Sequence, residues 1–348
     1  MSKSRYAFDQ PGRYARGWHI LAFSQELQRG DIKPLHYFGQ ELVLFRGHSG
    51  KAVVLDAYCP HLGAHLGGLG SQVVEDTLRC PFHGWQFDQA GSCVHIPYSD
   101  VIPSAARQAL RSWPLCELNG FIALWHDHEG GAPDYPLPEI PTWGPKNWGD
   151  WAFRRSTIKS HGKDIVENIV DLGHFASVHG SKAQVFENFF DEHTVTQFAR
   201  LTTGDPNATQ QIVPRGLSYD LEVASRLSPQ GTTSESWSTY HGPAIMYSHM
   251  ENPLALHPYK SWCINYYTPI DDEQVEVASA TIVAPHGDQA LPPDFMDTFP
   301  QTVHASFWQD VSVWQTKIYR NEPILCAGDG QIAKLRQWYE QFYLPKRS

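Results

Sequence analysis

The chain of 348 residues has no long apolar run, because no stretch approaches the roughly 18 residues of a membrane-spanning helix. Its N-terminus, Met-Ser-Lys-Ser-Arg-Tyr, lacks the apolar segment of a signal peptide. The net charge is −10 and no basic run occurs before Lys346-Arg347, which argues against nucleic acid or an anionic membrane surface as partner. These absences predict a cytoplasmic protein of about two domains with no membrane span.

Cysteine is also scarce. Six cysteines in a chain of this length do not make a disulfide scaffold. Cys93, Cys116, Cys263 and Cys326 are scattered and are predicted to be buried thiols. The chain also lacks a Rossmann glycine fingerprint and the cysteine quartet of a plant-type ferredoxin.

What the chain does contain is a pair of Cys–His motifs. Cys59-Pro-His61 is followed, after eighteen residues, by Cys80-Pro-Phe-His83-Gly-Trp. Two such loops supply two sulfurs and two imidazoles, a set that zinc accepts and that a Rieske [2Fe–2S] cluster also accepts. Structural zinc sites more often use Cys-x2-4-Cys, and glycines in both loops let main-chain N–H groups approach the sulfurs of a cluster. The pattern therefore favours the cluster.

Short strand signals surround these motifs. The apolar runs at 41–46 and 51–56 predict a hairpin, and a further strand is predicted at 120–125. Short strands separated by Gly and Asp are typical of a small antiparallel β domain. Five prolines within residues 132–151 indicate a linker. The predicted organisation is thus a domain at 1–131, the linker at 132–151 and a second domain at 152–348.

The second half changes character. A helix is predicted over 163–178, strands over 216–224, 235–240, 244–249, 261–268 and 275–283, and helices over 293–317 and 330–342. Strands between an early and a late helix predict an α+β domain that is able to hold an internal cavity.

The first predicted helix carries His174 and His179. Five residues on a regular α-helix separate two side chains by about 140°, so they share an ion only if the helix loosens or ends between them, and Gly180 permits an end. The alternative is two ordinary histidines, one buried and one on the surface. Asp171 lies on the same helical face as His174 and can accept the ring N–H that a metal leaves free.

The combination of Cys-x-His-x18-Cys-x2-His with Asp-x2-His-x4-His resembles the Rieske non-heme iron oxygenases. The resemblance implies a [2Fe–2S] cluster whose buried iron is bound by Cys59 and Cys80 and whose outer iron is bound by His61 and His83. Respiratory Rieske proteins carry two further bridged cysteines and a serine, where this chain has Ala64, Phe82 and Trp85. Fewer hydrogen bonds to the cluster imply a lower reduction potential, as in oxygenases.

The resemblance also implies a mononuclear Fe(II) bound by His174, His179 and a carboxylate on a late helix. The candidates are Asp294, Asp297 and Asp310, and Asp310 is preferred because the family ligand lies near an aromatic residue, as in Gln-Asp310-Val-Ser-Val-Trp. The implied fold class is α+β, an all-β Rieske domain followed by a helix-grip (START-like) catalytic domain with an antiparallel sheet.

Family members are ring-shaped homotrimers, in which the cluster of one subunit faces the iron of the next. By this resemblance Asp171 accepts hydrogen bonds from His83 of one subunit and His174 of the next, and forms the electron-transfer bridge. O₂ is the co-substrate. Because no flavin or NAD(P)H motif is present, these cofactors are expected in a separate reductase of the flavin or ferredoxin type.

The C-terminal segment, from Trp314-Gln-Thr-Lys to Gln-Trp338-Tyr-Glu-Gln-Phe-Tyr343, resembles the oxygenase component of 3-ketosteroid 9α-hydroxylase and the cholesterol 7-desaturases. This implies a monooxygenase that hydroxylates or desaturates a steroid or sterol ring. The alternatives are hydroxylation or demethylation of a smaller aromatic or alicyclic acid and, in a different class, a Rieske electron-transfer protein. Candidate pocket residues are Trp237, Tyr240, Met246, Tyr247, Trp262, Tyr266, Phe299, Phe307 and Trp308.

Overall fold

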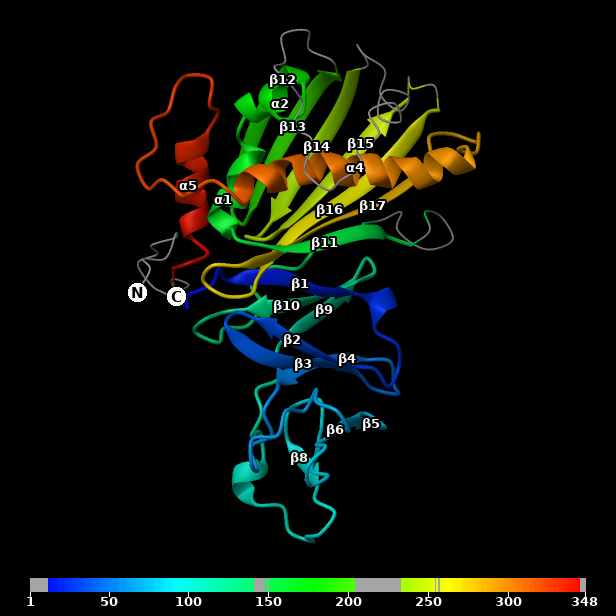
Figure 1. Ribbon diagram of the computed structural model, residues 1–348, viewed down its shortest axis with the longest axis vertical. Coiled ribbons are helices and arrows are strands. Elements are labelled where there is room, and N and C mark those ends of the chain that lie inside the picture. The colour runs from blue at the N-terminus through cyan, green and yellow to red at the C-terminus, as the bar shows by residue number, and fades with distance from the viewer. Residues whose placement is uncertain are drawn as a thin grey trace. The chain divides into compact units, whose positions relative to one another are not determined.

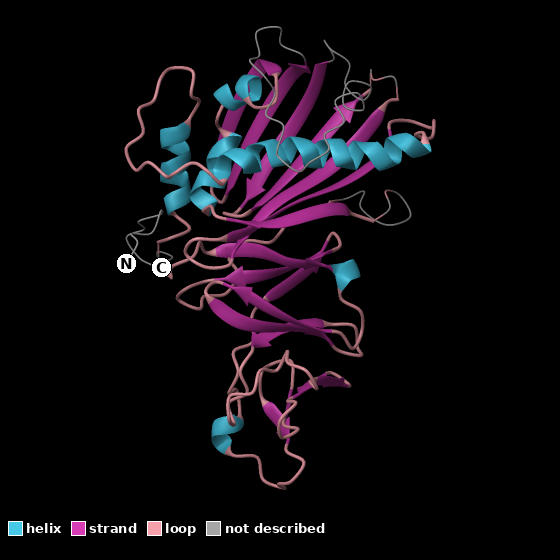
Figure 2. Ribbon diagram, in the orientation of Figure 1, coloured by secondary structure: helices cyan, strands magenta, loops and turns pink. Residues whose placement is uncertain are grey.

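The computed structural model describes residues 12–140, 148, 150–203, 233–253, 255 and 257–344. The chain forms two compact units (Figures 1 and 2). The first comprises Gly12–Glu139 with Thr268–Asp271, and the second comprises the remainder. None of the helices in the described part of the chain combines the length and hydropathy that crossing a membrane requires.

The first unit consists of three small sheets with the orders β1-β10-β9, β2-β3-β4 and β5-β6-β7-β8. The predicted hairpin is confirmed, since strands at 40–46 and 52–56 pair antiparallel. The elements are β1 (Gly17–Phe23), η1 (Ser24–Glu26), β2 (Ile32–Tyr37), β3 (Gln40–Arg46), β4 (Ala52–Asp56), β5 (Gln72–Val74), β6 (Thr77–Arg79), β7 (Gln86–Phe87), β8 (Cys93–His95), η2 (Ser104–Ala106), β9 (Leu115–Leu118) and β10 (Phe121–His126).

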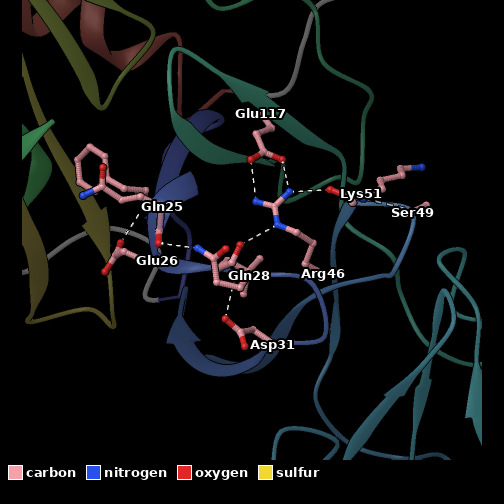
Figure 3. A network of polar contacts seen from close by, with 11 residues as sticks. Gln25, Glu26, Gln28, Asp31, Arg46, Ser49, Lys51 and Glu117 are labelled. Atoms are coloured by element: carbon pink, nitrogen blue, oxygen red, sulfur yellow. Dashed lines mark hydrogen bonds and ion pairs between the residues drawn. The ribbon is translucent and has the colours of Figure 1, made fainter. Parts of the chain in front are cut away.

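A buried arginine ties two of these sheets together. Arg46, at the end of β3, is only 8% exposed and donates two hydrogen bonds to the carboxylate of Glu117 on β9, at 2.9 and 2.7 Å. Its Nε also donates to the Leu27 carbonyl at 2.8 Å (Figure 3). The guanidinium is therefore held on both edges, which compensates for its removal from water.

The proline-rich segment begins as part of the first unit rather than as a free linker. The Trp18 indole N–H donates to the Tyr135 carbonyl at 2.9 Å, and the Asn119 amide donates to the Pro138 carbonyl at 2.9 Å. Arg16 pairs with Asp134. These contacts place the boundary of the first unit after Glu139, later than the predicted residue 131.

The second unit is a seven-stranded sheet in the order β11-β17-β16-β15-β14-β13-β12, with the long helix α4 lying across one face (Figure 1). This is the arrangement expected of a helix-grip fold. Its elements are β11 (Ala152–Ile158), α1 (Gly162–Val166), η3 (Glu167–Ile169), α2 (Gly173–Ser177), β12 (Ser181–Asp191), β13 (Thr194–Thr203), β14 (Thr233–His241), β15 (Ile245–Asn252), β16 (Tyr259–Pro269), β17 (Val275–Pro285), α4 (Pro293–Trp314) and α5 (Ile332–Glu340).

Several predicted elements differ in extent. The helix predicted over 163–178 is broken into α1, η3 and α2, and β12 and β13 have no counterpart among the predicted strands. The predicted strand at 216–224 lies outside the described residues. All six cysteines are free. The prediction of buried thiols is right for Cys93 and wrong for Cys326, which is exposed, while Cys116 and Cys263 are partly buried.

Two contacts identify the face of the sheet that η3 and α4 cover. Tyr259 of β16 packs on Phe295 and Phe299 of α4, with ring centroids 5.5 and 4.7 Å apart. Gln197 of β13 donates to the Ile169 carbonyl of η3 at 2.7 Å. Alternation and register then define the helix-facing side of β13 to β16 as Val195, Gln197, Ala199, Leu201, Ser234, Ser236, Ser238, Tyr240, Met246, Ser248, Met250, Asn252, Tyr259, Ser261, Cys263, Asn265 and Tyr267.

Candidate metal centres

The two Cys–His loops have the same main-chain design. The Cys59 amide donates to the Ala64 carbonyl at 2.8 Å, and the Cys80 amide donates to the Trp85 carbonyl at 2.8 Å, in each case five residues on. In each loop a glycine four residues after the cysteine donates back to the cysteine carbonyl, Gly63 at 2.9 Å and Gly84 at 3.2 Å. Both glycines have positive φ, 76° and 74°, a conformation that other residues adopt at a cost.

The loops bring the four predicted cluster ligands together. The cysteines are buried, each 3% exposed, and their thiols lie within hydrogen-bonding reach of each other. The rings of His61 and His83 meet edge to face with centroids 4.7 Å apart, and both keep some exposure. Two inner sulfurs and two outer imidazoles fit a cluster with a buried and an outer iron.

Burial dominates the chemistry of the thiols. It raises the pKa of Cys59 to about 11, and the nearby Cys80 adds to the rise. Two thiolates side by side in this setting need a positive group between them, which is what a metal centre supplies. The donor set and its environment therefore fit the predicted cluster.

The second centre lies where α4 passes α2. His174, His179 and Asp310 each offer one ligand atom, and these atoms lie within 4.8 Å of one another. His179 Nε2 is 3.2 Å from Asp310 Oδ1, and the two histidine rings are 5.2 Å apart. Asp310 is 9% exposed, whereas the other candidates, Asp294 and Asp297, are exposed at the far end of α4.

Both imidazoles are fixed through their Nδ1 atoms. His174 Nδ1 donates to the Asp171 main-chain carbonyl at 2.6 Å, and His179 Nδ1 donates to the Gln309 amide oxygen at 2.9 Å. Because Nδ1 carries the proton in each ring, Nε2 keeps its lone pair toward the shared space. Two Nε2 atoms and a carboxylate form the facial set that non-heme Fe(II) uses, with open positions remaining.

Charge coupling between the three residues supports this arrangement. Burial, reinforced by the neighbouring His179, lowers the pKa of His174 against the opposing effect of the Asp310 carboxylate. Burial opposes charge on His179 as well, but the Asp310 carboxylate outweighs it and raises the pKa of His179. For Asp310, burial favours the neutral acid, yet His179 beside it lowers the pKa below its usual value. A carboxylate that is ionised although buried attracts a cation to this position.

The helix does end between the two histidines, as sharing an ion requires. α2 stops at Ser177, and Gly180 follows with φ of 64°. Asp171 differs from the prediction in one respect: its main-chain carbonyl, not its carboxylate, binds the His174 ring. The carboxylate instead accepts the amides of Gly173 and His174 at 2.9 and 3.3 Å, because these first N–H groups of α2 lack helical partners.

Several residues that support the ligands were not expected from the sequence. Gln309 fixes His179, the Asn168 amide lies 3.4 Å from His174 Nε2, and the Ser306 hydroxyl lies 3.4 Å from His179 Nδ1. Gln309 directly precedes Asp310 in the sequence, and this position beside a candidate ligand is the one signal from which its role could have been inferred. Glu167 beside this site pairs with Arg336 of α5 at 2.5 Å, which ties the C-terminal segment to η3.

The aromatic pocket candidates divide between the two faces of the sheet. Tyr240 and Met246 belong to the helix-facing side, and the charge of Asp310 contributes to a raised pKa of Tyr240. On α4, Phe307 is buried about one turn before Asp310, Trp308 is buried against Arg154 of β11, and Phe299 packs on Tyr259 nearer the start of the helix. Strand alternation places the remaining candidates on the opposite face, where they do not line a space under α4: Trp237, Tyr247, Trp262 and Tyr266.

Comparison with known families agrees with both centres. Residues 17–113 match the Rieske [2Fe-2S] domain, and residues 124–343 match the 3-ketosteroid 9alpha-hydroxylase C-terminal domain. The chain belongs to the 3-ketosteroid 9α-hydroxylase family of Rieske oxygenases. A 3-ketosteroid-9-alpha-monooxygenase oxygenase component of Rhodococcus rhodochrous is 34% identical over 339 residues, which cover 96% of this chain and 82% of the relative.

Two further proteins resemble this chain over most of its length. Cholesterol 7-desaturase nvd 1 of Ciona intestinalis is 31% identical, over 96% of this chain and 70% of its own length. The crystal structure of dicamba monooxygenase bound to dicamba has a TM-score of 0.72 at 19% identity, over 95% of this chain and 98% of that one, and shows the shared fold. As a Rieske oxygenase the chain is an oxidoreductase that uses a [2Fe–2S] cluster, non-heme iron and O₂.

Proposed function

We propose that the chain is the terminal oxygenase of a multicomponent monooxygenase, which hydroxylates or desaturates a ring of a steroid or sterol. The observation that carries this proposal is the pair of centres on one chain, with the second inside a domain that matches the 3-ketosteroid 9alpha-hydroxylase model over residues 124–343. The names of the relatives in Rhodococcus and Ciona support a steroid or sterol substrate.

The helix-facing side favours a neutral substrate. None of the residues on this side of β13 to β16 is Lys or Arg, whereas Arg154 of the neighbouring strand β11 contacts α4, its guanidinium 4.9 Å from the Trp308 ring. An anionic group that enters over β13 to β16 therefore meets no basic partner from these four strands. An unpaired buried carboxylate costs on the order of several kcal/mol. This composition suits a ketosteroid or sterol better than the alternative of an aromatic or alicyclic acid.

The residues of the second centre have separable tasks. When bound, the iron supplies open positions for O₂ and substrate. Asp310 provides the negative charge of the ligand set, while Gln309 and the Asp171 carbonyl keep each histidine in one tautomer. Phe307, three residues before Asp310, is buried on the same face of α4 and adds apolar surface beside the ligands, which limits the access of water.

Electron supply and assembly follow from the same family relation. The relatives are named oxygenase components, which supports a separate reductase that carries flavin and uses NAD(P)H. We propose a homotrimer in the cytoplasm, in which the cluster of one subunit serves the iron of the next through Asp171. The pair of centres on each chain argues against a simple Rieske electron carrier, which needs no second iron.

A single turnover tests the proposed function. The purified protein, loaded with cluster and iron, is reduced chemically and exposed to O₂ with a panel of 3-ketosteroids, sterols and aromatic acids. Mass spectrometry is expected to show a steroid or sterol that gains one oxygen or loses two hydrogens. Product from the aromatic acids alone would favour the alternative substrate class. Oxidation of the reduced cluster without any product would favour the electron carrier.

A further inference from the structure

One of the predicted cluster ligands is covered by an aromatic side chain. The Trp85 indole lies flat on the His61 imidazole, with ring centroids 4.6 Å apart and planes inclined by 7°. His83, the other imidazole ligand, meets His61 edge on at 4.7 Å. One face of His61 is therefore closed by Trp85, and its edge is met by the second ligand.

Trp85 is held in turn by Tyr98. The indole is 9% exposed, and its Nε1–H donates to the Tyr98 hydroxyl at 2.8 Å. Tyr98 lies outside the hydrophobic core, since it is 61% exposed and borders a surface hollow of about 360 Å³ lined by residues of 94–102. A tyrosine this exposed contributes little to core packing. It contacts the cluster loops through the hydroxyl that accepts from Trp85 and through a ring edge 6.4 Å from the His83 ring centroid, and the substitution Tyr98→Phe removes only the first of these contacts.

The two contacts together restrict the ligand. A buried indole N–H without an acceptor is unfavourable, so the hydrogen bond selects one orientation of Trp85. That orientation leaves His61 no room to tilt on its covered side and keeps water from that side. Orientation and solvent access of an imidazole ligand are among the factors that set the reduction potential of an iron–sulfur cluster.

We propose that Tyr98 and Trp85 are a positioning pair, which holds the His61 ring and thereby keeps the reduction potential of the cluster low. Reduction adds an electron and thus one negative charge to the cluster, and water near the outer iron stabilises the more charged reduced form. Loosening the pair therefore raises the potential. The inference concerns the cluster alone and does not depend on which substrate the second centre oxidises.

The test uses the full chain with its cluster. Tyr98→Phe removes one hydroxyl, and the matched control is Tyr58→Phe, an exposed tyrosine beside Cys59 whose ring meets His65 rather than a ligand. In a redox titration at fixed pH, the reduced-to-oxidised ratio of the cluster at a given applied potential is expected to be about tenfold higher in Tyr98→Phe than in the wild type. This corresponds to a reduction potential about 59 mV higher for one electron. The EPR signal of the reduced cluster should shift as well, while Tyr58→Phe leaves both unchanged.

A second variant tests whether Tyr98 acts through Trp85. Trp85→Phe keeps an aromatic ring but removes the N–H donor, and it is expected to raise the potential in the same direction. The double variant should then shift no further than Trp85→Phe alone, because the hydrogen bond is already absent. Equal potentials for Tyr98→Phe and Tyr58→Phe, or fully additive shifts in the double variant, would overturn the proposal. If Trp85→Phe does not retain the cluster, Tyr98→Phe against Tyr58→Phe decides alone.

Discussion

Asp310 is the residue on which the second centre most depends, because it is the one acidic ligand candidate within 4.8 Å of both histidine nitrogens in the described chain. Asp310→Asn keeps its shape and removes its charge. We expect the affinity for mononuclear iron to fall by more than about 100-fold, since even partners of ligands contribute about 10–100-fold. Iron analysis should show loss of this ion with the visible spectrum of the cluster intact.

The same helix offers a control for that experiment. Asp297 is exposed on α4, far from the histidines, so Asp297→Asn should keep the full iron content. Full occupancy in Asp310→Asn would mean that another group completes the ligand set. A loss of iron in both variants would point to a disturbed helix rather than to a missing ligand.

The Arg46–Glu117 pair should make the stability of the protein depend on pH. Partial burial by itself raises the pKa of Glu117, but the two hydrogen bonds from Arg46 outweigh it, so the pKa lies below the usual 4.5 of a glutamate. A lowered folded-state pKa contributes stability above the unfolded pKa, which is lost as the pH falls through the folded pKa. Glu117→Gln should thus cost about 1–2 kcal/mol at pH 7, after allowing for solvent screening.

Thermal unfolding of the full chain between pH 7 and pH 3.5 checks this prediction. The Tm gap between wild type and Glu117→Gln is expected to be constant above pH 4.5 and to close below it. Glu75→Gln, at a glutamate whose side chain is 87% exposed, serves as the control and should show little gap at any pH. A gap that persists unchanged to low pH would show that the pair stabilises by shape and not by charge.

Helix α2 connects the two roles of Asp171, which caps this helix and is proposed to carry electrons between subunits. Its carboxylate accepts the amides of Gly173 and His174, and the helix it caps carries an iron ligand. Asp171→Ala loses cap and charge together, whereas Asp171→Asn keeps a side chain that still caps. We expect Asp171→Ala to lower the free energy of unfolding by about 1 kcal/mol and to lose part of its mononuclear iron. Asp171→Asn should keep both metals yet transfer electrons from cluster to iron slowly.

Stopped-flow absorbance separates these outcomes. The cluster is reduced first, and its reoxidation is followed after mixing with O₂ and substrate, together with iron content. Fast reoxidation in Asp171→Asn would remove the bridging role and leave Asp171 as a helix cap only. The comparison is informative because the structure shows the cap, while the bridge is a proposal about neighbouring subunits.

Local patterns predicted the parts of this fold that short segments determine. The two Cys–His loops depend on glycines within four residues, and the β3–β4 hairpin on the turn between its strands, so both were readable from the sequence. The break of residues 163–178 into three helical pieces was not, because apolar spacing remains helical across it. The pairing of His179 with Gln309, 130 positions away, likewise depends on where α4 crosses the sheet.

The same dependence on contacts between distant parts of the chain explains why some of the aromatic pocket candidates lie on the wrong face of the sheet. Trp237 and Tyr240 belong to one strand and are both aromatic, but three residues of a strand turn them to opposite faces. Only the register to β15 and the position of α4 decide which face belongs to the metal site. Composition therefore suggested an aromatic pocket, whereas the helix-facing side is also rich in hydroxyl and amide groups such as Ser238, Ser248 and Asn265.

For the whole molecule, the proposed trimer predicts that two inactive chains can restore each other. Cys80→Ser removes a cluster ligand and Asp310→Ala removes an iron ligand, so each variant alone should be inactive. In mixed trimers, the cluster of the Asp310→Ala subunit faces the intact iron of a Cys80→Ser neighbour. Each mixed trimer, whichever variant is in excess, contains one competent donor–acceptor interface out of three, so isolated mixed trimers are expected to show about one third of wild-type turnover.

Co-expression with two different affinity tags isolates the mixed trimers for this measurement. Adding Asp171→Asn to the Cys80→Ser chain, which carries the working iron, should abolish the regained activity, because the bridge at that interface is then changed. Adding it to the Asp310→Ala chain should not, since the iron site of that chain is already inactive. No regained activity in mixed trimers that hold both metals would mean that electrons pass within one chain, and Asp171 would then need a different role.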